Sequence, residues 1–239
     1  MYFVVGDPHG CSTELKEILK YWNRKTSKLI ILGDLNDRGP DSYGCIKLAM
    51  KLEEDGSSIC LLGNHCLEFR QWLEVVDNES FYYLNSFDET IKSFFPNTPA
   101  VLTRYTKEKI ATDIRENHQD IIEFIKNRPL YYETEHLLFS HSGCNLQPNW
   151  KDSTEKDCLD IRNPFIYGEN LTGKKIIFGH TPTKNMNEDQ SDDVWVSPCG
   201  TKIGVDGGCV YGGQLNAVLI DDKGRILNKY VVKSKKKYY

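Results

Sequence analysis

The chain has 239 residues, of which 39% are hydrophobic and 27% charged, and its formal net charge is −4. This length suits one domain, or one domain with a modest insertion, and the composition is sufficient for a buried core. The acidic balance argues against non-specific binding to nucleic acid, which needs many Lys and Arg side chains facing phosphates. Only the tail, residues 233–239, is distinctly basic, and we expect it to be a frayed, solvated terminus.

The start of the chain and its cysteines indicate a cellular compartment. Residues 1–7 read M-Y-F-V-V-G-D, without the charged and long apolar regions of a signal peptide or membrane span. The eight cysteines form no C-x-x-C pair and are most simply reduced thiols. We therefore expect a cytoplasmic protein that does not associate with membranes.

The first part of the chain alternates short apolar runs with helical periodicity. The runs at 2–5, 29–32 and 59–62 are typical of strands that are buried on both faces. Between them, residues 13–23 and 42–54 carry apolar side chains at helical spacing. This β-α-β-α-β order predicts the start of an α/β sheet.

The middle of the chain differs from its two ends. Residues 67–128 contain several amphipathic helical stretches and no good strand, which predicts a helical insertion over one edge of a single domain spanning 1–239. Strands are expected again at the apolar segments 137–139, 175–178, 217–220 and 230–232, the last two joined by a hairpin turn at 221–224.

Polar side chains follow five of the predicted strands, at the point where each strand ends. Loops at the carboxyl ends of strands in an open sheet converge on one crevice. Singly, an Asp in such a place usually makes a turn, and a single His is more often a satisfied, partly buried residue than a ligand. The combination is what indicates a site; its members are Asp7, His9, Asp34, Asp37, Arg38, Asn64, His65, His141 and His180. The two remaining histidines, His118 and His136, lack this setting and are expected at the surface.

The residue types in this set suit divalent metal ions. A mixture of carboxylate oxygens and imidazole nitrogens favours Mn²⁺, Fe or Zn²⁺. Asp7 and His9, two residues apart on extended chain, project to the same side and can bind one ion. A single carboxylate such as Asp34 can bridge two ions, as in two-metal phosphatases.

Several motifs resemble those of a known family. Residues 6–10, 33–39 and 63–65 read G-D-P-H-G, G-D-L-N-D-R-G and G-N-H. They resemble the motifs of the phosphoprotein phosphatase (PPP) branch of calcineurin-like metallophosphoesterases. Residues 140–143, 179–182 and 205–213 complete a pattern similar to the bacterial and phage members, which include lambda-type protein phosphatases and diadenosine tetraphosphatases. The resemblance implies an α/β fold with a central β-sandwich flanked by α-helices.

The resemblance also implies a role for each site residue. Asp7, His9 and the bridging Asp34 would hold one metal ion, and Asp34, Asn64, His141 and His180 the other. Arg38 and Arg162 would bind phosphate oxygens, while His65, oriented by Asp37, would protonate the leaving group. Two divalent ions, Mn²⁺ in the first place with Fe or Zn²⁺ as alternatives, would supply a metal-bridging hydroxide near neutral pH.

The closing loop and one departure complete the comparison with the family. We interpret Asp206 as structural support and Tyr211 as a wall of the pocket. Cys66 stands where the family commonly has an acidic residue after Gly-Asn-His. That acid is not a metal ligand, so we expect the site to survive this substitution.

These residues predict an enzyme, a metal-dependent phosphatase. All six ligand positions, His65 and both Arg are chemically fit, which disfavours a non-catalytic scaffold. We expect a serine/threonine phosphoprotein phosphatase, with symmetrical bis(5′-nucleosyl)-tetraphosphatase activity on diadenosine tetraphosphate as the alternative. The preference depends on adenine recognition, since the aromatic residues within 81–95 are expected in a core rather than around a base. The expected partner is a phosphoprotein, phosphopeptide or nucleotide substrate, with no preference for an oligomeric state.

Overall fold

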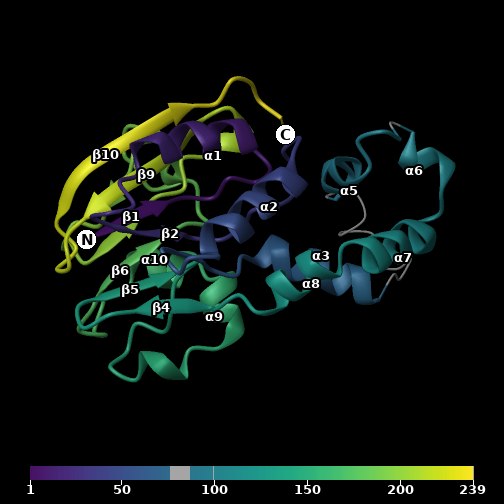
Figure 1. The fold of residues 1–239 in the computed structure, drawn as a ribbon. Helices are drawn as coiled ribbons and strands as arrows, with labels where there is room; N and C mark the ends of the chain where they lie inside the picture. Colours follow the sequence, from purple (N-terminus) through teal and green to yellow (C-terminus); the bar gives the residue numbers. More distant parts are fainter. Residues whose placement is uncertain (76–86, 99, 239) are drawn as a thin grey trace.

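A computed structural model describes residues 1–75, 87–98 and 100–238. Two five-stranded sheets pack against each other and carry helices on their outer sides (Figure 1). This is the α/β sandwich flanked by helices that the sequence predicted. The first sheet has the order β10-β9-β1-β2-β3, from Ile226–Lys233, Gln214–Ile220, Tyr2–Val5, Lys28–Ile31 and Ser58–Cys60. The second has the order β4-β5-β6-β8-β7, from Tyr131–Glu133, Leu137–Ser140, Lys175–Phe178, Lys202–Gly204 and Trp195–Val196.

The helices of the described chain fall into three groups. Two of them, α1 (Ser12–Ile18) and α2 (Ser42–Glu53), connect the strands β1, β2 and β3. The second group forms the predicted insertion: α3 (Asn64–Glu74), α5 (Asp88–Phe94), α6 (Val101–Arg104), α7 (Lys107–Asn117) and α8 (Gln119–Lys126). The third group, α9 (Glu155–Leu159) and α10 (Asn163–Tyr167), packs by the second sheet. Short 3₁₀ turns lie elsewhere along the chain, at Leu19–Tyr21, Trp150–Asp152, Thr183–Asn185 and Cys209–Tyr211.

Central strands such as β1 and β2 are buried on both faces, which explains their uninterrupted apolar runs. In β1, Val4 belongs to the cluster of side chains between the two sheets, whereas Phe3 and Val5 belong to the cluster beneath the helices. In β2, Ile30 and Leu29 divide in the same way. Since both faces need apolar side chains, alternation disappears from the sequence.

The insertion lies to one side of the sandwich (Figure 1), and its described part contains no strand. Its aromatic residues form a core, as expected: the Phe69 ring lies 5.4 Å from the Phe87 ring and 5.7 Å from the Phe94 ring. Residues 76–86 and 99 of the predicted insertion, including the aromatic residues at 81–83, lie outside the described residues.

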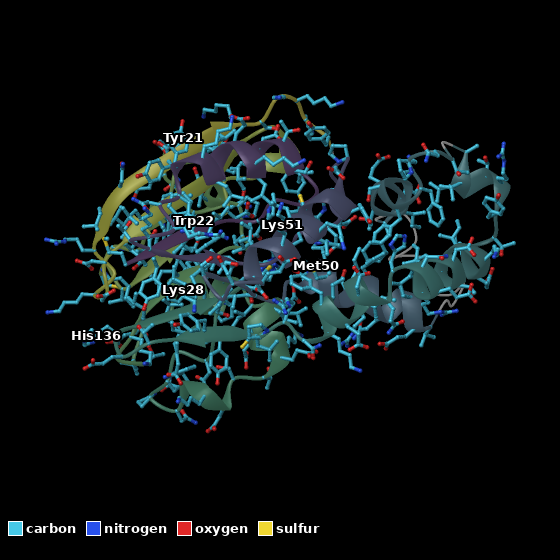
Figure 2. The ribbon with its side chains drawn as sticks, in the orientation of Figure 1. Tyr21, Trp22, Lys28, Met50, Lys51 and His136 are labelled. Atoms are coloured by element: carbon cyan, nitrogen blue, oxygen red, sulfur yellow. The ribbon has the colours of Figure 1, made fainter. Side chains whose placement is uncertain are left out.

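Two expectations about surface residues need correction. The basic tail is not frayed over its described length: the Ser234 amide donates to the Gly213 carbonyl, and the Tyr238 amide to the Val210 carbonyl. The reason is that the Tyr238 side chain packs against the main core. His136 is exposed at the end of the sandwich far from the insertion (Figure 2), but His118 packs its ring against Tyr43 and Phe94.

Candidate active site

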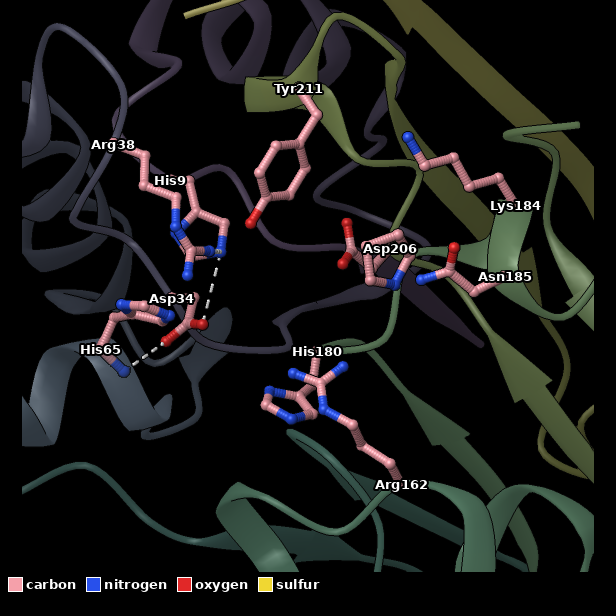
Figure 3. Close-up of a pocket in the computed structure, with 11 residues that line it drawn as sticks. His9, Asp34, Arg38, His65, Arg162, His180, Lys184, Asn185, Asp206 and Tyr211 are labelled. Atoms are coloured by element: carbon pink, nitrogen blue, oxygen red, sulfur yellow. Dashed lines mark hydrogen bonds and ion pairs between the residues drawn. The ribbon is translucent and has the colours of Figure 1, made fainter. Parts of the chain in front are cut away.

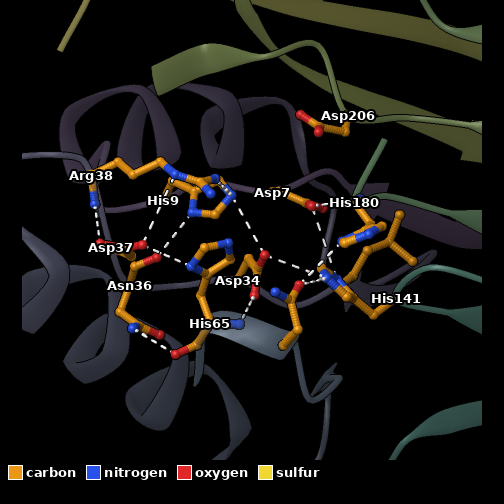
Figure 4. A network of polar contacts seen from close by, with 12 residues as sticks. Asp7, His9, Asp34, Asn36, Asp37, Arg38, His65, His141, His180 and Asp206 are labelled. Atoms are coloured by element: carbon orange, nitrogen blue, oxygen red, sulfur yellow. Dashed lines mark hydrogen bonds and ion pairs between the residues drawn. The ribbon is translucent and has the colours of Figure 1, made fainter. Parts of the chain in front are cut away.

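The loops that carry the predicted residues meet at one edge of the sandwich. Strands β1, β2 and β3 are parallel, as are β5, β6 and β8, so their carboxyl ends point the same way within each sheet. Asp7 and Asp34 lie in loops after β1 and β2, and His65 lies in the first turn of α3, which follows β3. His141 and His180 follow β5 and β6. Figure 4 shows the side chains of both sheets facing one another in a single polar network.

The backbone of this network is strained. Six described non-glycine residues have φ in the left-handed region, and five of them are predicted site residues: His9, Asp34, Asp37, Arg38 and His180. A left-handed conformation costs a side-chain-bearing residue about 1–3 kcal/mol, and such residues cluster at functional sites. The strained backbone therefore lowers local stability, and it directs these side chains toward the polar network.

His9 and Asp34 form the first half of the network. The His9 Nδ1 lies 3.0 Å from the Asn36 carbonyl, to which it must donate, so in the neutral ring Nε2 carries the lone pair. That Nε2 lies 3.5 Å from Asp34 Oδ2. Burial is the main reason why the pKa of His9 is lowered to about 3, and the ring is therefore neutral.

Asn64, His141 and His180 form the second half around the same carboxylate. The His141 Nδ1 lies 2.9 Å from the Leu32 carbonyl, so its Nε2 faces inward, 3.3 Å from Asp34 Oδ2 and 3.0 Å from Asn64 Oδ1. The His180 Nδ1 lies 3.1 Å from the same Asn64 oxygen. Burial, assisted by His141 and Arg162, lowers the pKa of His180 to about 2.

Ring nitrogens of His9 and His141 thus approach the Asp34 carboxylate from the two halves, and the Arg38 guanidinium also contacts His9 Nε2 at 3.3 Å. The pKa values show the demand for positive charge: burial would lower the pKa of His141, but Asp34 and Asp7 raise it to about 9. Burial would likewise raise the pKa of Asp34, yet His141 and His65 hold it well below its ordinary range. Two groups of potential ligand atoms lie within 4.8 Å of one another, His9 with Asp34 and His65, and Asp34 with His141 and His180.

Asp7 completes the ring of potential ligands. Its Oδ2 accepts from the His180 amide at 2.6 Å, while its buried Oδ1 has no hydrogen-bond partner in the described part of the chain. Burial and the neighbouring Asp206 raise the pKa of Asp7 well above its ordinary range. A Cβ on Gly179 would lie 2.0 Å from that Oδ1, so only glycine permits this approach. An orphaned buried carboxylate oxygen beside neutral imidazoles fits a divalent metal ion.

His65 and Asp37 form a pair beside the ligands rather than among the converging lone pairs. The His65 Nδ1 lies 2.7 Å from Asp37 Oδ2, and both side chains are largely buried. Asp37 is itself held, because its Oδ1 accepts from the Arg38 amide at 2.8 Å. Burial raises the pKa of the adjacent Cys66 to about 12, so this thiol is an inert packing group.

A cavity of about 290 Å³ opens above the network and is lined by the predicted arginines. Arg38 and Arg162 enter it from opposite walls (Figure 3), although Arg162 comes from a distant part of the chain. Arg162 precedes the short helix α10, and its Nη1 lies 3.4 Å from Thr181 Oγ1. The buried Lys202 ammonium holds α10 from below by donating to the carbonyls of Phe165, Ile166 and Gly168.

Tyr211 and Asp206, expected in the pocket wall and as support, both line this cavity. Lys184 and Asn185 line it as well, and sequence reasoning did not name either residue. The signal was present, since both residues closely follow the Gly-His-Thr-Pro motif at 179–182, whose His faces the network. It also missed Asn36, whose carbonyl orients His9 and whose side-chain amide donates to the His65 carbonyl.

Several known proteins are similar to this chain in sequence or in fold. The asymmetrical bis(5′-nucleosyl)-tetraphosphatase PrpE of Anoxybacillus flavithermus is 25% identical over 91% of this chain and 89% of its own length. The symmetrical bis(5′-nucleosyl)-tetraphosphatase of Vibrio parahaemolyticus is 28% identical over 71% of this chain and 53% of its own length. A solved structure provisionally described as a diadenosine tetraphosphatase superposes with a TM-score of 0.64 at 19% identity, over 98% of this chain and 93% of that one.

Within the described residues, no helix has the length and apolarity needed to cross a membrane.

The model of the calcineurin-like phosphoesterase family matches residues 2–198, which is most of the chain. The strand-end motifs, the His and Asp clusters and this match lead to one conclusion: the chain is a hydrolase that belongs to the calcineurin-like phosphoesterases.

Proposed function

We propose that the chain is a two-metal hydrolase in which Asp34 bridges the ions. Asp7 and His9 would complete the first site, and Asn64, His141 and His180 the second. Support comes from the neutral imidazoles and from the orphaned Asp7 oxygen. When bound, the ions supply an activated water and neutralise charge that develops on phosphate. The mixed oxygen and nitrogen donors favour Mn²⁺ over Mg²⁺, with Fe or Zn²⁺ as alternatives.

The surrounding residues divide the remaining work. Arg38 and Arg162 would bind oxygens of the reacting phosphate, because planar guanidinium groups match phosphate geometry and stabilise its negative charge. His65 would protonate the leaving oxygen from Nε2. Its Nδ1 lies 2.7 Å from Asp37 Oδ2, an ion-pair contact that would orient the ring.

For the substrate we propose a dinucleoside polyphosphate. The observation that carries this choice is the set of three cationic side chains, Arg38, Arg162 and Lys184, around one cavity. Two arginines suffice for a single phosphate, whereas a phosphate chain presents charge for a third cation. The relatives named as bis(5′-nucleosyl)-tetraphosphatases support the same choice. This reverses the preference that the sequence alone suggested.

A serine/threonine phosphoprotein phosphatase is the second candidate. It is favoured by the Gly-Asp-Leu-Asn-Asp-Arg-Gly motif at 33–39, which resembles that of the PPP branch. A cytoplasmic location is part of the proposal, because seven of the eight cysteines are buried as free thiols, which suits a reducing compartment.

The test compares two substrates in the same Mn²⁺ buffer. We expect kcat/KM for diadenosine tetraphosphate to exceed that for a phosphothreonine peptide by at least about tenfold, a transition-state difference of ~1.4 kcal/mol. A tenfold preference for the peptide would establish the second candidate instead. Chromatography of the products identifies the bond that water attacks: ATP with AMP for asymmetrical cleavage, or two ADP for symmetrical cleavage. An Asp34→Asn variant, prepared identically, controls for contaminating hydrolases.

A further inference from the structure

The wall of the cavity that carries Lys184 is a short, tightly held turn. It follows β6 and comprises the 3₁₀ turn Thr183–Asn185. The Thr183 amide donates to the Asp206 carbonyl at 2.7 Å, and the Met186 amide donates back to Thr183 at 2.9 Å. Thr183 is buried, while Lys184 is exposed at the rim. The backbone therefore presents the Lys184 side chain from a defined position.

The Lys184 ammonium lies at the cavity rim without an ion-pair partner among the described residues. Within the described chain it forms no hydrogen bond or ion pair with another residue, and its Nζ lies 6.0 Å from the centre of the Tyr211 ring. The Arg38 guanidinium lies 5.4 Å from the centre of the same ring. In Figure 3 the Tyr211 ring lies between these two cations, and Asn185 lies next to Lys184. The cationic side chains of Arg38 and Lys184 thus lie on the two sides of Tyr211 along the cavity wall.

The spacing of these cations separates two tasks. Arg38 and Arg162 face the Asp34 network, where the reacting phosphate would lie. Lys184 lies on the opposite side of the Tyr211 ring from Arg38 (Figure 3), so it would bind negative charge further along a ligand. A lysine ammonium is a compact charge on a flexible stem, which suits a phosphate whose position varies. The neighbouring Asn185 amide can donate to the same oxygens.

We propose that Lys184, assisted by Asn185, forms a subsite for the phosphates next to the one that is attacked. The ligand class is a linear polyphosphate chain, either inorganic or esterified to nucleosides. The subsite makes the enzyme prefer phosphate chains to phosphomonoesters. This inference rests on the proposed function, because it assumes that the reacting phosphate binds between the two arginines.

The first experiment compares Lys184→Met with Lys184→Arg. Lys184→Met should lower kcat/KM for diadenosine tetraphosphate at least about tenfold more than kcat/KM for p-nitrophenyl phosphate, mainly through KM, because it removes ground-state and transition-state binding alike. Lys184→Arg should recover most of the loss. The control is Lys223→Met, which removes an exposed lysine in the β9–β10 turn and should change neither substrate. Equal losses on both substrates would overturn the subsite.

The second experiment does not depend on dinucleotide hydrolysis. Tripolyphosphate and orthophosphate are compared as inhibitors of p-nitrophenyl phosphate hydrolysis at a fixed concentration of free Mn²⁺. The wild-type enzyme should bind tripolyphosphate at least tenfold more tightly, and Lys184→Met should remove most of that difference. If the difference persists in Lys184→Met, or is absent from the wild type, the subsite is wrong. If it depends on Lys184 but diadenosine tetraphosphate is not cleaved, the subsite stands and the proposed nucleotide substrate is wrong.

Discussion

Replacement of His65 by Asn tests the division between metal ligands and proton donor. The Asn side chain keeps a polar group of similar reach but cannot donate a proton at neutral pH. His65 Nδ1 lies 2.7 Å from Asp37 Oδ2, and the Asp37 amide is hydrogen-bonded to the Ser42 and Thr90 hydroxyls at 3.1 and 3.0 Å. The His65 ring thus contacts the carboxylate of Asp37, whose own backbone is fixed by hydrogen bonds. This is the arrangement expected of an oriented general acid.

The expected magnitude follows from that role. Loss of a positioned proton donor lowers kcat by about 10²–10⁴-fold, or about 3–5 kcal/mol of transition-state stabilisation. The loss should be largest for substrates with basic leaving groups and at most about tenfold for p-nitrophenyl phosphate, whose leaving group needs little protonation. Asp37→Asn, which keeps the imidazole but removes its anchor, should cost less than His65→Asn on the same substrate.

Metal content decides between the two readings of His65. Its ring lies close enough to His9 and Asp34 to be a ligand, since their potential ligand atoms are within 4.8 Å of one another. Purified His65→Asn should retain wild-type metal content by elemental analysis, whereas His141→Asn should lose it. If His65→Asn loses metal in proportion to its activity, or shows the same loss on both kinds of leaving group, His65 is a ligand and the general-acid role is refuted.

Two further predictions concern the metal ions and the scaffold. Exhaustive chelation should abolish hydrolysis of p-nitrophenyl phosphate, and Mn²⁺ should restore more activity than Mg²⁺ because three imidazole ligands disfavour Mg²⁺; full activity after stripping would contradict the two-metal proposal. Lys202→Met should leave three carbonyls, two of them fully buried, without their shared donor. It should lower the free energy of unfolding by about 2–4 kcal/mol and the melting temperature by roughly 5–15 °C. Lys202→Met should also weaken phosphate binding, because Arg162 directly precedes the helix α10 that Lys202 holds. If Lys202→Met is as stable as Lys223→Met, Lys202 contributes nothing to the stability of the fold.

The sequence by itself determined the strands that carry the site and the chemistry at their ends. Strands β1, β2 and β3 were predictable because each is a local apolar run whose two faces are both buried. The residues of the network were predictable as candidates because each follows such a run directly. Both properties are encoded within a few neighbouring residues, so they can be read without knowledge of the rest of the chain.

Only the tertiary structure decided which features cooperate across the chain. The strands β4, β7 and β8 have two or three residues each, too few for a periodic pattern to give their bounds. β4 and β7 pair with their chain neighbours β5 and β8, and β8 pairs with the distant β6. The basic tail looked like a solvated terminus, yet it packs along the loop that carries Tyr211. Lys184 was not singled out from the sequence, and the fold places it with Arg38 and Arg162 around one cavity. The physical reason is that strand formation and ligand chemistry are local properties, whereas a shared cavity and its electric field arise from side chains that are distant in sequence.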